Sequence, residues 1–354
     1  MAQNADHFAI VIGIRGYSQL RPLKGAESDA ANFALWLTSD EGGGLPAKNV
    51  AIITSPPVSS SNNPYDARPV QWEIDAALTR FGIEKNDRIG KRLYFYFSGH
   101  GFGPSFVDVG MLMANASLNR LNYSIGLLPY RLFFRDVEAF DEIVFILDCC
   151  RDPHGGVEPL KPGFTLPKRG TGTKIQDFVM LGAAYGEEAY QPLHTGTNER
   201  RGLLTQAVLE GLTQTEAADG LGRFTSSSLS YYVKHRVPEL AGQADVDQTP
   251  NIDTTNLRQE IVFSTIPDSK LERVPVLIVA PPGLTGNLVL FDGFGNELAR
   301  HPASDAVAPG GWPVTLIRNR WYEVKRTPIA PGVKPNIIDL TQINGDPHIY
   351  EFKP

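Results

Sequence analysis

The sequence contains little cysteine, no excess of basic residues and no long apolar run, and each shortage argues against a class of protein. Of 354 residues only Cys149 and Cys150 are cysteines, and two neighbours in the chain cannot close an ordinary disulfide loop. The formal net charge of −6 disfavours a nucleic-acid-binding surface of clustered Lys and Arg. No stretch has the apolar length that spans a bilayer. We therefore expect a protein of the reducing cytoplasm that binds neither nucleic acid nor membrane.

The first residues, MAQNADHFAIVIGI, contain an apolar run but lack the other parts of a signal peptide. No basic region precedes the run, and no small-residue cleavage site follows it. Hydrophobic residues make up 42% of the chain and charged residues 20%, which is typical of a globular protein. The length predicts two domains, or one large domain with an appendage.

Apolar runs alternate with amphipathic stretches over the first two-thirds of the chain, which predicts βαβ units and a mostly parallel sheet. Strands are expected at 8–14, 49–54, 92–97, 142–147 and 178–184. Helices are expected at 26–40, 70–82, 203–212 and 226–240. The connections 101–141 and 151–177 are longer, and the glycines and prolines of the second predict a loop.

After about residue 265 the pattern changes to short strand-like runs separated by Gly, Pro and Asn turns. LFDGFGNEL carries a hairpin signal, and no long helix is expected there. The sequence thus predicts an α/β domain over 1–265 and a small all-β sandwich over 272–354. Trp312, Trp321, Tyr322 and Phe291 lie at strand positions of the sandwich, where aromatic residues are usually core.

Two strand ends bear residues that can perform chemistry. The strand at 92–97 leads into Ser98-Gly99-His100-Gly101, and the strand at 142–147 into Asp148-Cys149-Cys150-Arg151. Sites in parallel α/β sheets form at the carboxyl ends of strands, so a His and a Cys placed there can meet. An imidazole lowers the pKa of a thiol and then protonates a leaving amine. Alone, such a His is more often a turn residue and such a Cys a buried apolar one; together they predict a catalytic dyad.

These motifs resemble those of caspase-like cysteine peptidases of family C14, and among them the metacaspases and their bacterial orthocaspase relatives. The resemblance covers roughly residues 8–262. The matching stretches are FAIVIGIRGY, LKGAESDAANFALWL, YFYFSGHG, FILDCCRD, VMLGAAYGEEAY, GLLTQAVLEGL and QTPNID. It implies a caspase-like three-layer fold with Cys150, not Cys149, as the nucleophile. It also implies His100 as the general base and the Gly101 N–H in the oxyanion hole. The family usually continues with His, Ser and Gly after the nucleophile, whereas this chain has Arg151-Asp152-Pro153.

The resemblance also implies which residue precedes the cleaved bond. The acids of the metacaspase specificity pocket match Asp29 and Asp148 here, with Ser98 nearby. Two carboxylates around one pocket favour Arg or Lys, since a guanidinium binds carboxylate oxygens in pairs. Animal caspases bind Asp through arginines, and no matching pocket is evident. An Asp-specific peptidase stays as an alternative, as does an ordinary structural role for both acids.

Basic residues in the loop 151–177 are candidate processing sites, which would make the chain a zymogen. They are Lys161, Lys168, Arg169 and Lys174. A plain solvated loop is the alternative.

No cofactor follows from the sequence. Cys149, Cys150 and His154 lack zinc spacing, and the calcium-binding acids of some metacaspases cannot be mapped onto this chain. The expected partners are a protein or peptide substrate and a regulatory protein that binds the C-terminal β domain. The rival function is a catalytically silent signalling or scaffold protein with the same fold.

Overall fold

The computed structural model describes residues 4–56, 63–193, 199–328, 335–341 and 348–353. The chain forms two compact units. The first comprises Met1–Glu210 and Tyr232–Glu260, and the second comprises Gly211–Tyr231 and Ile261–Pro354. The linear division into 1–265 and 272–354 stays a prediction about independent folding.

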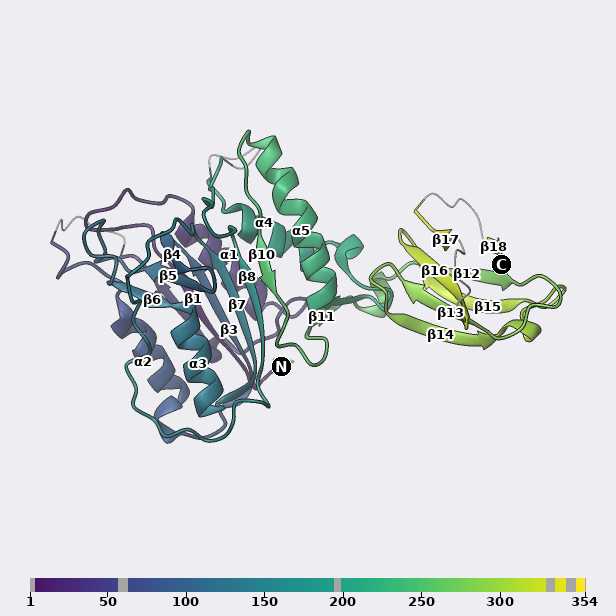
Figure 1. The fold of residues 1–354 in the computed structure, drawn as a ribbon, viewed down its shortest axis with the longest axis horizontal. Coiled ribbons are helices and arrows are strands. Elements are labelled where there is room, and N and C mark those ends of the chain that lie inside the picture. Colours follow the sequence, from purple (N-terminus) through teal and green to yellow (C-terminus); the bar gives the residue numbers. More distant parts are fainter. Residues whose placement is uncertain (1–3, 57–62, 194–198, 329–334, 342–347, 354) are drawn as a thin grey trace. The chain divides into compact units, whose positions relative to one another are not determined.

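A six-stranded sheet forms the centre of the first unit (Figure 1). Its strands lie in the order β10-β8-β7-β3-β1-β2, and every neighbouring pair is parallel except β10–β8. The predicted mostly parallel sheet is therefore confirmed. The strands are β1 (His7–Gly13), β2 (Val50–Thr54), β3 (Gly90–Ser98), β7 (Phe140–Asp148), β8 (Gln176–Leu181) and β10 (Asn251–Asp253).

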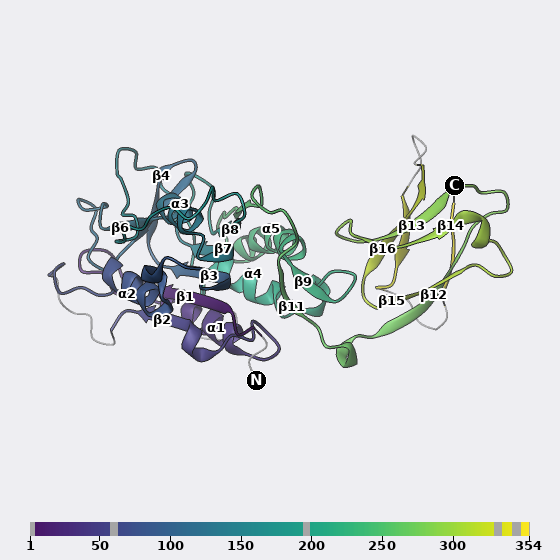
Figure 2. The same cartoon turned by 90° about the horizontal axis from the view of Figure 1, so that it is seen from below.

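Helices cover both faces of this sheet because successive side chains of a strand point to opposite sides. Phe95 of β3 packs on Tyr130 of α3, with 5.4 Å between the ring centroids. Tyr96, the next residue, stacks on Phe33 of α1 at 4.6 Å. Figures 1 and 2 show α1 and α3 on opposite sides of the sheet. The helices are α1 (Ala26–Thr38), α2 (Gln71–Phe81), α3 (Leu127–Val137), α4 (Leu203–Gly211) and α5 (Ser226–Gln243). None in the described part is long and apolar enough to cross a bilayer.

The connection 101–141 is more regular than its sequence pattern indicates. It contains α3 and a small antiparallel sheet of β4 (Gly101–Ser105), β5 (Asp108–Leu112) and β6 (Ser124–Gly126). Strands of three to five residues are too short to show alternation. Pro129 obscures the helix pattern, although proline is tolerated in a first helical turn.

Two sheets form the body of the second unit, as expected for a sandwich. One has the order β15-β12-β18 and the other β14-β13-β16-β17. The predicted hairpin is the antiparallel β13–β14 pair, whereas the parallel β12–β18 pair was not foreseen. These strands are β12 (Arg273–Val279), β13 (Asn287–Asp292), β14 (Glu297–Pro302), β15 (Trp312–Ile317), β16 (Trp321–Thr327), β17 (Asn336–Asp339) and β18 (His348–Glu351).

A short antiparallel pair and several 3-10 turns complete the description. The pair is β9 (Arg223–Thr225) with β11 (Val262–Thr265), and both strands belong to the second unit. The 3-10 turns are η1 (Ala47–Asn49), η2 (Ile83–Lys85), η3 (Thr215–Ala217), η4 (Asp268–Lys270) and η5 (Ala303–Asp305).

Candidate active site

His100 and Cys150 lie at the same edge of the central sheet. They follow β3 and β7, which are adjacent and parallel, and the last residues of these strands, Ser98 and Asp148, are paired in register. Each candidate catalytic residue stands two positions beyond that pair. The sheet topology therefore places two residues that are fifty positions apart in the sequence at neighbouring strand ends.

Gly101 fits closely between the two strand ends. A Cβ at this position would lie 2.6 Å from the sulfur of Cys149 and 2.9 Å from the carbonyl oxygen of Cys150. Any larger residue would push the backbone after His100 away from the backbone of Cys150. This contact explains why glycine follows the histidine, and it places the candidate oxyanion residue directly beside the candidate nucleophile.

His100 is held from two sides by groups of the loop after β1. Its backbone N–H donates to the hydroxyl of Tyr17 at 2.7 Å, and its ring Nε2 lies 2.7 Å from the carbonyl oxygen of Arg21. Because a carbonyl oxygen only accepts, Nε2 carries the proton and Nδ1 of the neutral ring is left as a base. Burial lowers the pKa of His100, which favours this neutral form.

The Cys150 thiol is partly buried against Ala189. The backbone N–H of Ala189 donates to Sγ at 3.3 Å, and Sγ lies 3.7 Å from the carbonyl oxygen of the same residue. Burial raises the pKa of the thiol to about 11; the Ala189 N–H opposes this effect, and the nearby Asp152 and Glu188 charges add to it. The thiol is thus protonated at neutral pH in this arrangement.

The 186–191 segment is fixed over the thiol by bonds at both of its ends. Gly186 and Glu187 exchange backbone hydrogen bonds with Arg151 at 3.1 and 3.0 Å. The N–H of Tyr190 donates at 2.8 Å to Gln248, whose amide donates in turn to the Gly182 carbonyl at 2.8 Å. Access to Sγ therefore depends on the position of this segment.

Gln191 ends this segment beside the candidate specificity residues. Its amide Nε2 donates to the Ser98 hydroxyl at 3.3 Å, and its Oε1 accepts from the N–H of Gly25 at 3.2 Å. The side chain thus joins the end of β3 to the N-terminus of α1.

Asp29, Asp148 and Ser98 are buried together. Oδ2 of Asp29 accepts from the N–H of Gly202 at 2.9 Å and from the Ser98 hydroxyl at 3.4 Å. Oδ2 of Asp148 accepts from the N–H and the hydroxyl of Thr205 at 2.9 and 2.7 Å. A Cβ on Gly202 would lie 2.1 Å from Asp148 Oδ2 and 3.1 Å from Asp29 Oδ2, so both carboxyl groups face this glycine.

Burial and mutual repulsion make this pair of acids hard to ionise. Burial, and then the charge of Asp148, raise the pKa of Asp29 to about 8, and burial raises that of Asp148 to about 6. Within the described residues, Oδ1 of Asp29 has no hydrogen-bond partner although it is buried. A cation brought to this place would favour the ionised forms and satisfy that oxygen.

Arg151, where the chain departs from the family pattern, is buried beside the candidate nucleophile. Its Nη2 donates to the carbonyl of Phe106 at 2.7 Å, and its guanidinium lies 5.8 Å from the ring centroid of Tyr185. The rings of Phe106 and Tyr185 are themselves 4.2 Å apart. Arg151 thereby links the β4–β5 turn to the loop after β8, next to Cys150.

The four candidate processing residues, Lys161, Lys168, Arg169 and Lys174, lie on the surface of the loop after β7. Lys168 forms an ion pair with Asp136 at 2.9 Å, and Arg169 one with Asp87 at 3.2 Å. No cluster of three or more His, Cys, Asp or Glu side chains that could hold a metal ion occurs among the described residues.

Several contributors to the site were not identified from the sequence. Arg21 and Ala189 act through backbone groups, which no residue type signals. Tyr17, Gly202 and Thr205 lie inside stretches that match the family, but the sequence did not indicate what their side chains or backbone groups would contact.

A family model and two individual proteins are similar to this chain. The family model described as caspase domain matches residues 6–262. A curated relative named a probable protease, from a Desulfuromonadales bacterium, is 31% identical over 220 residues. That match covers 59% of this chain and 26% of the relative, so the chain spans about a quarter of its length. Among solved structures, caspase-1 from Spodoptera frugiperda aligns with 14% identity and a TM-score of 0.46, over 75% of this chain and 92% of that one. The chain belongs to the caspase-like cysteine peptidase family.

Proposed function

We propose that this chain is an endopeptidase that cleaves after Arg or Lys through a Cys150–His100 dyad. The observation that supports the proposal is the pairing of Ser98 with Asp148 in register, because His100 and Cys150 each follow two positions later at the sheet edge that also bears two buried acids. The family supplies the reaction class, since its members are peptidases.

The chemistry follows from the groups present. Nδ1 of His100 takes the proton from Sγ of Cys150, and the thiolate attacks the carbonyl carbon of the scissile bond. The Gly101 N–H would stabilise the oxyanion. The C–N bond then breaks as the imidazolium gives its proton to the leaving amine, which leaves a thioester. Water, losing its proton to His100, attacks the thioester and releases the carboxylate product, and the thiol regains its proton.

Specificity for a basic residue rests on Asp29 and Asp148. A guanidinium or ammonium group beside them would replace the desolvation penalty with ion pairs, and it would lower the pKa values of both acids. An aspartate substrate would instead bring a further negative charge to a buried pair of acids that already resists ionisation.

Fluorogenic peptides ending in Arg, Lys or Asp test this proposal. We expect cleavage after Arg or Lys, complete loss in Cys150→Ala, and a KM at least ~10-fold higher in Asp29→Asn, because one ion pair is lost. Asp40→Asn is the matched control, since Asp40 is exposed beyond α1. Cleavage only after Asp would refute the pocket assignment. Silence towards every peptide, even after limited proteolysis, would favour the scaffold function.

Activation is proposed to require movement of the 186–191 segment and processing in the loop after β7. The raised pKa of the thiol and the position of Ala189 against Sγ support a latent starting state. Mass spectrometry of the wild type and of Cys150→Ala after incubation would find cuts after Lys161, Lys168, Arg169 or Lys174 in the wild type only. An uncut chain with full activity would remove the processing step. A regulatory partner for the β unit stays a prediction.

A further inference from the structure

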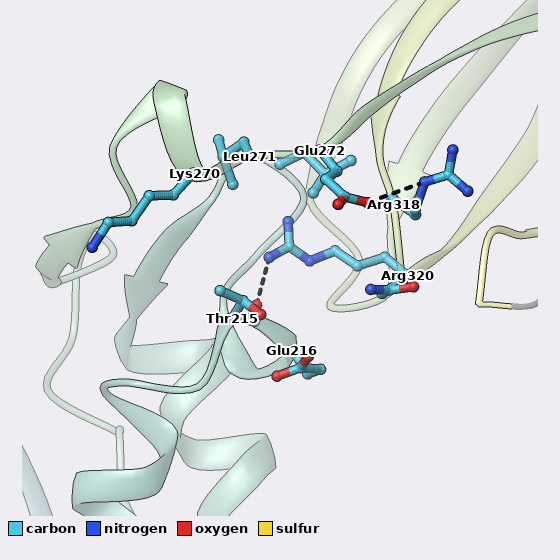
Figure 3. Close-up of a pocket in the computed structure, with 9 residues that line it drawn as sticks. Thr215, Glu216, Lys270, Leu271, Glu272, Arg318 and Arg320 are labelled. Carbon is cyan, nitrogen blue, oxygen red and sulfur yellow. Dashed lines mark hydrogen bonds and ion pairs between the residues drawn. The ribbon is translucent and has the colours of Figure 1, made fainter. Parts of the chain in front are cut away.

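The second unit contains a cavity of about 180 Å³ whose lining includes none of the candidate catalytic or specificity residues. Its walls come from η3, from the residues around η4 and from the turn between β15 and β16 (Figure 3). The charged side chains that line it are Glu216, Lys270, Glu272, Arg318 and Arg320. This volume is about six times the ~30 Å³ that one water occupies in the liquid, so it has room for a small oxyanion and its waters.

Arg320 is the unusual member of this wall, because it is only 8% exposed. Its Nη2 donates to the carbonyl of Thr215 at 2.6 Å. Nε and Nη1 are buried and have no hydrogen-bond partner among the described residues. In Figure 3 the guanidinium points into the middle of the pocket, between Thr215 and Leu271. Burying a cation whose donors are unsatisfied costs free energy, unless an anion accepts hydrogen bonds from those donors.

The carboxylates around the pocket do not pair directly with Arg320, although the charges of Asp219 and Glu216 act on it from a distance. Asp219 is paired with Arg223 at 2.7 Å. Glu272 is paired with Arg318 at 3.3 Å. Glu216 is exposed to solvent, and Figure 3 shows no bond between it and the guanidinium of Arg320. Lys270 adds a further positive charge to the lining. The wall therefore contains three cations and two carboxylates, and one of these carboxylates, Glu272, is already paired with Arg318.

We propose that this cavity is a binding site for a small oxyanion group, a carboxylate or a phosphate, with Arg320 as its principal contact. The unused N–H groups of the guanidinium provide charge-assisted donors for such a group. Arg318 stays with Glu272 and closes one side of the site. This site is independent of the proposed peptidase reaction and is tested without it.

The test is an NMR titration of the full chain as Cys150→Ala, with ¹⁵N-labelled arginine, using inorganic phosphate or acetate at constant ionic strength. The Nε–H signal of Arg320 is assigned as the one that is absent from the spectrum of Arg320→Gln. In the parent protein we expect this signal to shift saturably with at least one of the two anions. Anion binding to Arg320→Gln, measured from the shift of the thermal unfolding midpoint that the anion causes, should be at least about tenfold weaker. Arg300→Gln is the charge-matched control, because Arg300 lies on the surface of the same unit beside Glu297.

The two anions distinguish the source of the bound group. A response to phosphate alone indicates phosphorylated ligands, and a response to acetate indicates acidic side chains or chain termini. No saturable shift with either anion, or a stabilisation that is equal in Arg320→Gln and the wild type, would overturn the proposal. If Arg320→Gln does not fold, Arg320→Lys keeps the charge but loses the fixed donors, and weaker binding in that variant is then the expected result.

Discussion

The state of the Cys150 thiol decides whether the site as described can react. With a pKa raised to about 11, the thiol is almost fully protonated at pH 7. We expect its alkylation by iodoacetamide to be slow at pH 7 and to accelerate up to about pH 11, as followed by mass spectrometry. The experiment uses Cys149→Ala, so that Cys150 is the one thiol left to alkylate. Cys149 is itself buried, and its pKa is raised. A plateau in rate near pH 7 would contradict the raised pKa.

The buried acids predict an unusual dependence of stability on pH. Because the pKa of Asp29 is raised to about 8, the native chain keeps a proton that the unfolded chain has released above pH ~4. Between these values the native state binds more protons, so its stability falls as pH rises. The contribution of Asp29 is fully present below pH ~4 and is lost through pH ~8.

Asp29→Asn should flatten that loss, since an amide resembles the protonated acid and still accepts from Gly202. Urea unfolding of Cys150→Ala, with and without Asp29→Asn, at pH 5, 6, 7 and 8 measures the effect. The two pH slopes should differ, and equal slopes would mean that Asp29 ionises normally.

At the scale of elements, the contacts of Ala189 with Sγ predict that the 186–191 segment limits access to the thiol. Gln248 holds it through the Tyr190 N–H and is only 3% exposed. Gln248→Ala removes this bond and the one to Gly182, and each is worth about 1 kcal/mol. We expect Cys150 to be alkylated roughly tenfold faster at pH 7 in this variant. Gln243→Ala is the control, because Gln243 is exposed on the adjoining helix, and its alkylation rate should equal that of the wild type. Equal rates in the two variants would show that the segment does not control access.

The elements themselves were largely predictable from sequence, because β1, β3 and β7 are long apolar runs ended by polar or glycine residues. That was sufficient to place His100 and Cys150 at one sheet edge. The three-residue β6 and the proline-containing α3 gave no comparable signal. Backbone contacts such as that of Arg21 with His100 depend on loop geometry, which no pattern of residue types encodes.

For the whole molecule, the segment Gly211–Tyr231 has a special place, since it belongs to the second unit although it lies between α4 and the rest of α5 in the chain. Asp292 of β13, which is 3% exposed, accepts from the N–H of Gly220 at 3.0 Å. The same carboxylate accepts from the backbone of Phe294 and Asn296 at 3.0 and 2.8 Å. One buried acid therefore organises a hairpin turn and joins it to the inserted segment.

Asp292→Ala should destabilise the second unit by about 2–4 kcal/mol, because it leaves several buried N–H groups without an acceptor. Thermal or urea unfolding of the full chain measures the change. Asp305→Ala, at an exposed position of the same unit, should alter stability by less than about 0.5 kcal/mol. An equally small effect of Asp292→Ala would show that Asp292 does not hold the hairpin turn and the inserted segment together.

The interleaved course of the chain restricts how the β unit could be exchanged between proteins. A graft that takes only residues 272–354 leaves Gly220 and Thr215 behind, and so it transplants Asp292 and Arg320 without the groups they bind. A complete transfer needs breaks at all three points where the chain passes between units, after Glu210, Tyr231 and Glu260. Evolutionary shuffling by a single crossover would therefore yield a chimera with an unfinished β unit.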